Sequence, residues 1–193
     1  RATAVVAAAA LLLGAALAGA AVGVVSADAP SVAVTNETGG GTASAPAGET
    51  VTVTVDANAT NVSAYQANLT FDPDVVRIVS VSGTDEFADP VTNVDNESGW
   101  VAFNQYRASN VTDPRLATVT VELVGAPGNE TAIAFAESDT KLSDAAARER
   151  NPRGYEGLTV TVESATDGTD GGDGGGDGDD GGSDGGDGDD GGD

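Results

Sequence analysis

Residues 64–81 read AYQANLTFDPDVVRIVSV and give the clearest indication of the fold. In its first half, apolar side chains occupy every second position, namely Tyr65, Ala67, Leu69 and Phe71. Such alternation is typical of a strand that buries one face and exposes the other. Pro73 then turns the chain, because its ring fixes φ and it has no backbone N–H group. The β-branched run from Val75 to Val81 indicates a second strand, so the unit is a strand, an Asp-Pro corner and a strand.

Short runs with the same character recur along the chain. They are Pro30–Asn36, Thr50–Val55, Val91–Val94, Gly99–Phe103, Leu116–Val124, Thr131–Phe135 and Leu158–Val162. About nine short strands at this spacing predict one all-β sandwich over residues 30–164. We expect these inward positions to be buried: Val53, Leu69, Phe71, Val119, Val121 and Val160. Residues 37–48, rich in Gly, Ser and Pro, are interpreted as a loop, and residues 143–150 as about two helical turns capped by Ser143.

The chain is strongly acidic and contains neither cysteine nor histidine. Its 193 residues include 31 acidic and 8 basic side chains, for a net charge of −23, and 11 of the acids lie from Asp167 onward. Without cysteine or histidine the usual zinc ligands are missing, so we expect no metal and no cofactor. The negative charge disfavours nucleic acid and anionic membranes as partners. An acid excess with a single lysine, Lys141, resembles proteins of extremely halophilic archaea, and a merely acidic secreted protein is the alternative.

Both ends of the sequence differ from the middle. Residues 1–27 are apolar and end in Val25-Ser26-Ala27, which predicts a secretory signal peptide, with an N-terminal membrane anchor as the alternative. Residues 165–193 are rich in Asp and Gly, and we expect a disordered linker there, because such side chains cannot build a core. The tail lacks the Glu of an EF-hand loop, so no specific calcium site is expected. The protein is therefore expected outside the cell or at the cell surface.

The ordered set of strands also carries a family resemblance. The run from Tyr65 to Val81, the strand LATVTV at residues 116–121 and the closing GLTVTV at residues 157–162 together resemble a cohesin domain, over about Ser31 to Glu163. The resemblance implies a nine-stranded jelly-roll sandwich in a secreted, non-catalytic module that binds a dockerin-type protein. It places that partner on a flat sheet face, at residues matched by position: Gln66 and Asn68 on one strand, and Asn104, Tyr106 and Arg107 on another. It also implies an association with polysaccharide binding or degradation at the cell surface.

Two other functions are alternatives to protein docking. A carbohydrate-binding or structural surface module would share the same sandwich, with Trp100 stacking on a sugar ring. Paired carboxylates such as Asp72 and Asp74 are the groups that a glycosidase uses. Asp is also favoured at turns, however, and an acidic surface supplies such pairs by chance. We therefore expect a binding module and not an enzyme.

Seven Asn-X-Ser/Thr sequons, the acceptor motif for N-linked glycans, precede the tail. They begin at Asn36, Asn58, Asn61, Asn68, Asn96, Asn110 and Asn129. A chain rich in Asn and Thr forms some sequons by chance, but this number favours glycosylation of some of them. Asn68 is expected on the outward side of its strand, as a glycan requires.

Overall fold

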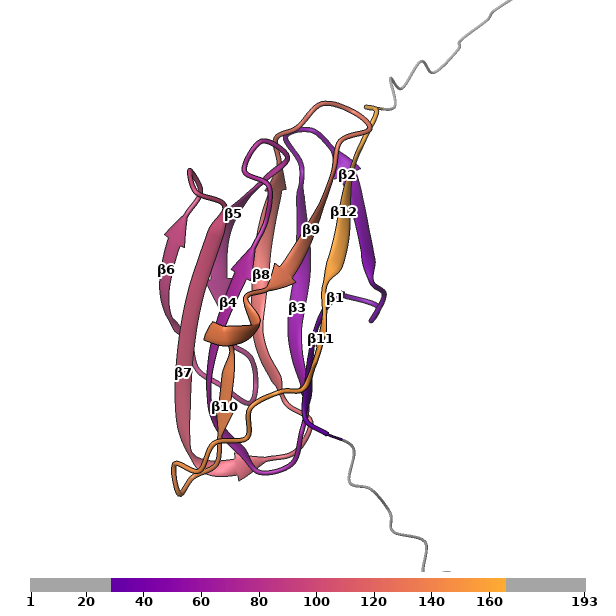
Figure 1. Ribbon diagram of the computed structural model, residues 1–193. Helices are drawn as coiled ribbons and strands as arrows, with labels where there is room; N and C mark the ends of the chain where they lie inside the picture. The colour runs from indigo at the N-terminus through magenta and orange to yellow at the C-terminus, as the bar shows by residue number, and fades with distance from the viewer. Residues whose placement is uncertain (1–28, 166–193) are drawn as a thin grey trace, which may run out of the picture.

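The Asp-Pro corner carries the chain from one β-sheet to the other. β4 (Val62–Thr70) belongs to a seven-stranded sheet, and β5 (Val76–Ser82) belongs to a five-stranded sheet. At the corner, the backbone N–H groups of Val75 and Val76 both donate to the carbonyl of Asp72 at 3.1 Å. The computed structural model describes residues 29–165, in which the two sheets lie face to face (Figure 1).

The five-stranded sheet has the order β11-β1-β3-β8-β5. Its further strands are β1 (Ser31–Asn36), β3 (Thr50–Asn58), β8 (Arg115–Leu123) and β11 (Gly154–Glu156). The pairs between β1, β3, β8 and β5 are antiparallel, and β11 joins β1 in parallel.

The seven-stranded sheet has the order β2-β12-β9-β4-β7-β6, and β10 also pairs with β4. Its further strands are β2 (Thr42–Pro46), β6 (Val91–Asp95), β7 (Trp100–Val111), β9 (Glu130–Phe135), β10 (Lys141–Ser143) and β12 (Leu158–Glu163). β9 and β10 both run along the same partner, β4, and are separated by a short 3₁₀ turn, η1 (Glu137–Asp139). The predicted all-β sandwich is thus confirmed.

The core lies between the sheets and is built mainly from aliphatic side chains. All of the positions expected to be inward are buried: Val53, Leu69, Phe71, Val119, Val121 and Val160. Each contributes through the apolar surface that it removes from water. The period-2 pattern therefore identified the correct face of every strand on which it was used.

Three strands were not expected, so the sandwich has twelve strands where about nine were predicted. β2 lies within residues 37–48, which were interpreted as a loop, and β10 and β11 were missed as well. β2 has the sequence TASAP, whose side chains are too small to show clear alternation. It is a strand because it pairs in parallel with β12, a long-range contact that the local sequence does not reveal.

The predicted helix over residues 143–150 is wrong, and the segment is a turn that follows β10. Asp144 is buried, and its Oδ1 accepts the backbone N–H groups of Ala146 and Arg148, both at 2.9 Å. These two hydrogen bonds hold the pKa of Asp144 below its ordinary value, and the bond from Arg148 contributes most. Ala147 has a φ of 58°, outside the helical region. An Asp side chain thus takes the amides that a helix would have used.

The two ends of the described chain emerge at opposite ends of the sandwich (Figure 1). The predicted signal peptide or anchor (residues 1–27) lies outside the described residues, and so does nearly all of the predicted disordered linker (165–193). Between residues 29 and 165, no helix is long and apolar enough to cross a membrane. The same residues contain no group of three or more His, Cys, Asp or Glu side chains arranged to hold a metal ion.

Candidate functional site

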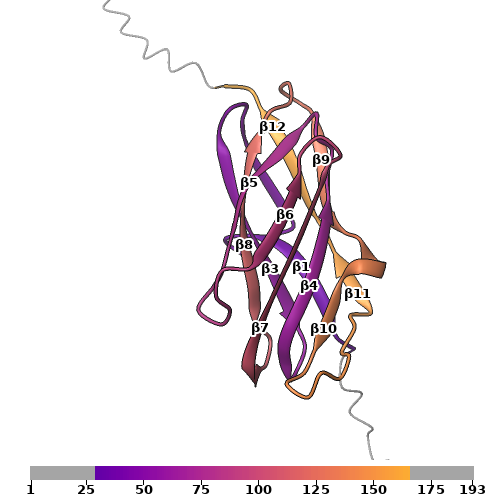
Figure 2. The ribbon, with the colours of Figure 1, turned by 90° about the vertical axis from the view of Figure 1, so that its left-hand side faces the viewer.

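The two strands singled out by the sequence are neighbours in one sheet. In the antiparallel pair of β4 and β7, Gln66 lies opposite Asn104, and Ala64 lies opposite Tyr106. On the other side of β7, Val91 of β6 lies opposite Asn104. Tyr106 and Val91 are 77% and 72% exposed, which is unusual for large apolar side chains. These positions share the outer face of the seven-stranded sheet, whose strands Figure 2 shows from the side of β6.

We call this surface the β4–β7 face, and define it by Gln66, Val91, Asn104, Tyr106 and Lys141. Lys141 joins it because β10 places it opposite Gln66 on the free side of β4. A shallow hollow of about 490 Å³ lies over the strands, with Gln66, Asn104, Tyr106 and Lys141 in its lining. The face is therefore open and nearly flat, and it has no deep cleft.

The strands of the β4–β7 face are poor in carboxylates although the chain is very acidic, and Glu149, from the segment after β10, is the one carboxylate residue in the lining of the hollow. The strands β4, β6, β7 and β10 contain one acidic residue, Asp95, at the end of β6. Its carboxylate accepts backbone N–H groups from Ser98 and Glu97, and the bond from Ser98 is the main cause of its lowered pKa. Depletion of charge around exposed aromatic and aliphatic side chains is a feature of interface centres.

The opposite outer face of the sandwich has a different chemistry. There Arg77 and Glu122 form an ion pair at 2.7 Å, and Arg115 and Asp56 form another at 3.1 Å. Threonines alternate along β3 and β8 beside these pairs. Solvated ion pairs and hydroxyls of this kind contribute little to association. The two faces are thus distinct: the β4–β7 face combines exposed Tyr106 and Val91 with few carboxylates, whereas ion pairs and threonines dominate the opposite face.

Asn68 points outward from β4 as predicted, but it is covered. Residues 136–140 loop across β4 between β9 and β10, and the backbone N–H of Ala136 donates to the Asn68 carbonyl at 2.8 Å. The side-chain Oδ1 of Asn68 is buried and has no hydrogen-bond partner among residues 29–165. Gln66 also contacts this loop, since its Nε2 donates to the carbonyl of Asp139 at 2.9 Å. Asn68 is therefore not part of the open surface.

Arg107 lies on the other side of β7 from Tyr106. Adjacent residues of a strand point to opposite faces, so the two side chains cannot share one surface. The Nη1 of Arg107 donates to the carbonyl of Glu86 at 3.0 Å, and its guanidinium lies 5.9 Å from the centre of the Phe87 ring. Of the five residues matched by position, the structure brings Gln66, Asn104 and Tyr106 together on one open face, and it separates Asn68 and Arg107 from them.

The loop between β5 and β6 supports the β4–β7 face from beneath. Phe87 of this loop is 1% exposed and meets Tyr65 edge to face, with ring centres 5.0 Å apart. Gln105 holds the same loop, because its Nε2 donates to the carbonyl of Asp89 at 2.6 Å. At Gly83, a Cβ atom would lie 2.5 Å from the Phe87 carbonyl oxygen, so only glycine fits. This support was not predicted, because the sequence gives only one local signal of it, a single aromatic residue within a polar segment.

Tyr65 carries a buried hydroxyl with no hydrogen-bond partner among the described residues. Burial raises the pKa of this phenol well above that of free tyrosine. An unpaired buried polar group costs free energy, so Tyr65→Phe should raise the free energy of unfolding by about 1 kcal/mol. The matched control is Tyr155→Phe, because the Tyr155 hydroxyl donates to the carbonyls of Pro152 (3.1 Å) and Glu137 (3.2 Å).

Tyr155→Phe should lower the free energy of unfolding by about 1 kcal/mol, the opposite sign. Chemical denaturation at one salt concentration measures both variants. Destabilisation by Tyr65→Phe would show that its hydroxyl has a stabilising partner after all.

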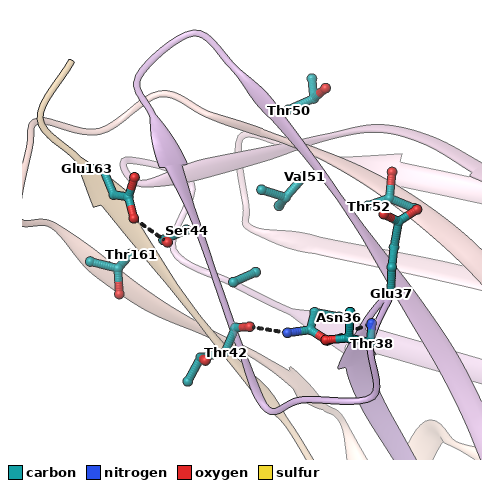
Figure 3. Close-up of a pocket in the computed structure, with 11 residues that line it drawn as sticks. Asn36, Glu37, Thr38, Thr42, Ser44, Thr50, Val51, Thr52, Thr161 and Glu163 are labelled. Atoms are coloured by element: carbon teal, nitrogen blue, oxygen red, sulfur yellow. Dashed lines mark hydrogen bonds between the residues drawn. The ribbon is translucent and has the colours of Figure 1, made fainter. Parts of the chain in front are cut away.

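A second, larger hollow of about 730 Å³ lies between β2, β3 and β12 (Figure 3). Its lining contains hydroxyl, amide and carboxylate groups and no aromatic side chain. Several of these groups bond one another: the Asn36 amide donates to the Thr42 carbonyl at 2.8 Å, and the Ser44 hydroxyl donates to Glu163 (Figure 3). This hollow therefore offers no ring on which a sugar would stack.

The exposed aromatic side chains do not form a row. Trp100 is half-buried at the start of β7. Tyr106 lies six residues further along the strand, roughly 20 Å away at the usual rise per residue. A sugar-binding platform needs adjacent rings, so the structure does not provide the feature that favours a carbohydrate-binding module.

The protein is thus a two-sheet β-sandwich with a candidate interaction surface on one open face. The cohesin domain family matches residues 40–163, well over half of the chain, and the protein therefore belongs to this family. The suspected family is thus confirmed. No curated protein sequence matches the chain.

Solved cohesins share the fold at low sequence identity. The third cohesin of ScaC from Acetivibrio cellulolyticus, solved in complex with the ScaB dockerin, is 19% identical with a TM-score of 0.56, covering 70% of this chain and 99% of that one. The non-cellulosomal cohesin of the archaeon Archaeoglobus fulgidus is 16% identical with a TM-score of 0.55, covering 69% and 92%. The cohesin module of a Clostridium perfringens family 33 glycoside hydrolase is 6% identical with a TM-score of 0.57, covering 70% and 97%. These similarities establish the fold.

Proposed function

We propose that this protein is a non-catalytic module that binds a dockerin-type protein through the β4–β7 face. The observation that carries the proposal is an open surface with few carboxylates and with exposed Tyr106 and Val91, on the two strands that the family resemblance assigns to docking, β4 and β7, and on the neighbouring β6. Tyrosine is among the residues that most often dominate binding energy at interfaces. One structural neighbour of the same fold was solved with a dockerin bound, which supports this choice of partner.

The size of the face is compatible with such a partner. A specific interface buries about 800 Å² on each protein, which one strand cannot supply. β10, β4, β7 and β6 have 3, 9, 12 and 5 residues, and at about 3.3 Å per residue and about 4.8 Å spacing they cover on the order of 450 Å² in plan. Side chains that stand above this plane add accessible area, so β10, β4, β7 and β6 together approach the required size.

Several carboxylates of the domain have structural roles, which supports a binding function rather than catalysis. Asp72 accepts the backbone N–H of Asp74 at 2.9 Å and so closes the corner after β4. Asp56 pairs with Arg115, and Asp144 organises the turn after β10. A glycosidase requires two carboxyl groups that flank a substrate cleft. The carboxylates named here lie at turns or in ion pairs.

We further propose that the protein acts outside the cell or at its surface, in association with polysaccharide binding or breakdown. The apolar residues 1–27 and the sequons support export. The charge excess supports an environment of high salt, where a Debye length of about 3 Å at 1 M screens repulsion between the acidic side chains.

Calorimetric titration of the protein in molar salt tests the proposed function. The titrants are the dockerin-type modules encoded in the same genome and, separately, soluble polysaccharides. We expect saturable one-to-one binding of at least one dockerin. Binding of a polysaccharide with no response to any dockerin would contradict the proposal and favour the carbohydrate-binding alternative.

A further inference from the structure

The fold divides the seven sequons into groups with different access to solvent. We propose that Asn58 and Asn110 are the N-glycan acceptors of the folded protein and that the β4–β7 face carries no glycan at its centre. The inference rests on the proposed export, because N-glycans of this type belong to exported surfaces. It does not depend on the identity of the docking partner.

At these two sequons, both the asparagine and the hydroxyl residue are open to solvent. Asn58 and Thr60 are exposed at the end of β3, and Asn110 and Thr112 are exposed at the end of β7. The Asn110 Oδ1 accepts the backbone N–H of Ala145 at 2.8 Å, a contact that leaves the side-chain nitrogen free. An enzyme that recognises the whole motif can therefore reach each site without unfolding the sandwich.

The two sequons lie beside each other at one end of the sandwich. The backbone N–H of Ala57 donates to the carbonyl of Pro114, and the N–H of Asp113 donates to the carbonyl of Ala59, both at 2.9 Å. These bonds join the segment around Asn58 to the segment that follows Asn110. Two glycans would thus form one patch at this end.

Three other asparagines use their side-chain amides to hold the fold. The Asn36 Nδ2 donates to the Thr42 carbonyl at 2.8 Å, and its Oδ1 closes the turn after β1. Asn96 bonds both backbone groups of Ile78 on the edge of β5, at 2.8 Å and 3.0 Å. Asn68 is covered by residues 136–140. A sugar on any of these nitrogens would displace the contacts that its side chain makes or the segment that covers it.

The last two sequons have an exposed asparagine but a buried hydroxyl. In the sequon of Asn61, Ser63 is buried and donates to the carbonyl of Arg107. In the sequon of Asn129, Thr131 is buried and accepts the backbone N–H of Asp72 at 2.9 Å. The hydroxyl that completes the motif cannot be reached in either case, so Asn58 and Asn110 remain as the two accessible acceptors.

The glycan on Asn110 would lie at the edge of the docking surface. Asn110 lies four residues beyond Tyr106 on β7, roughly 13 Å along the strand. A sugar there would border the β4–β7 face at this end, while Gln66, Asn104 and Tyr106 would stay uncovered. A partner would then approach over β6 or from the end of the strands that lies away from Asn110.

Glycopeptide mass spectrometry of the protein recovered from the cells that produce it tests the inference. With the glycan assigned to individual asparagines, we expect it on Asn58 and Asn110 and on none of Asn36, Asn61, Asn68, Asn96 and Asn129. Asn58→Gln, and Thr112→Ala in the sequon of Asn110, should each remove one glycan from the intact mass and leave the Tm unchanged, because Asn58 and Thr112 are both exposed. The matched control Asn96→Gln should retain both glycans and lower the Tm, because the longer side chain loses its paired contacts with Ile78.

Two results would overturn the inference. One is a glycan on Asn68 or Asn96. The other is secreted protein that is bare at both Asn58 and Asn110. If the protein is bare, dockerin binding measured on it shows whether the proposed function still holds, because the β4–β7 face does not need a glycan to bind.

Discussion

Replacing Phe87 by alanine is expected to lower the free energy of unfolding by about 3–5 kcal/mol, the usual cost of removing a buried phenylalanine. Phe87 is 1% exposed, and it packs edge to face against Tyr65 while Arg107 lies over its ring. The variant leaves a cavity beneath β4 and β7, and the surrounding side chains can fill it only in part. Chemical denaturation at fixed salt gives the value.

A substitution in the same loop provides the control for Phe87→Ala. Asp85 is exposed, and Asp85→Ala should change the free energy of unfolding by less than about 0.5 kcal/mol. A loss below about 1 kcal/mol for Phe87→Ala would show that the loop between β5 and β6 does not pack as described.

Replacing Tyr106 by alanine is expected to weaken dockerin binding by about 30-fold or more, which corresponds to about 2 kcal/mol for an interface anchor. The Tm should change little, because the side chain is 77% exposed and contributes almost nothing to the core. Calorimetric titration of wild type and variant with the same dockerin module measures the change in Kd.

The matched control for Tyr106→Ala is Val79→Ala. Val79 is also a large exposed side chain, at 54%, but it lies on β5 in the other sheet. Its removal should leave the Kd unchanged within a factor of two. Equal losses from Tyr106→Ala and Val79→Ala, or a loss from Val79→Ala alone, would place the binding surface elsewhere.

Most of the sandwich could be predicted because strand periodicity is a local signal. β4 shows it clearly: Tyr65, Ala67 and Leu69 alternate with polar residues, and all three are buried. The corner after β4 could also be predicted, because proline and two aspartates disfavour the continuation of a strand. Clear alternation thus defined both the strand and its buried face.

The missed elements depend on contacts far apart in the sequence. β2 is held by β12, more than a hundred residues away, and its small side chains carry no pattern of their own. The turn after β10 has good helix formers, yet the buried Asp144 takes the amides of Ala146 and Arg148. In both cases tertiary contacts overrode the local preference.

The candidate site was predicted only in part, because some of its features depend on local alternation and others on contacts distant in the sequence. Strand alternation placed Gln66 outward, and the family resemblance selected Asn104 and Tyr106, which lie on the strand paired with that of Gln66. Alternation could also have excluded Arg107, which directly follows Tyr106 on β7. Residues 136–140 cover Asn68, and no feature of the sequence near Asn68 predicts this contact.

Titration of the isotope-labelled protein with a dockerin module, followed by NMR, tests the docking face most directly. We expect the side-chain amide signals of Gln66 and Asn104 and the backbone signals of Val91 and Tyr106 to shift on binding. The signals of Asp56 and Arg115 on the opposite face should stay in place. Shifts confined to that opposite face, with Gln66, Asn104 and Tyr106 unaffected, would contradict the account.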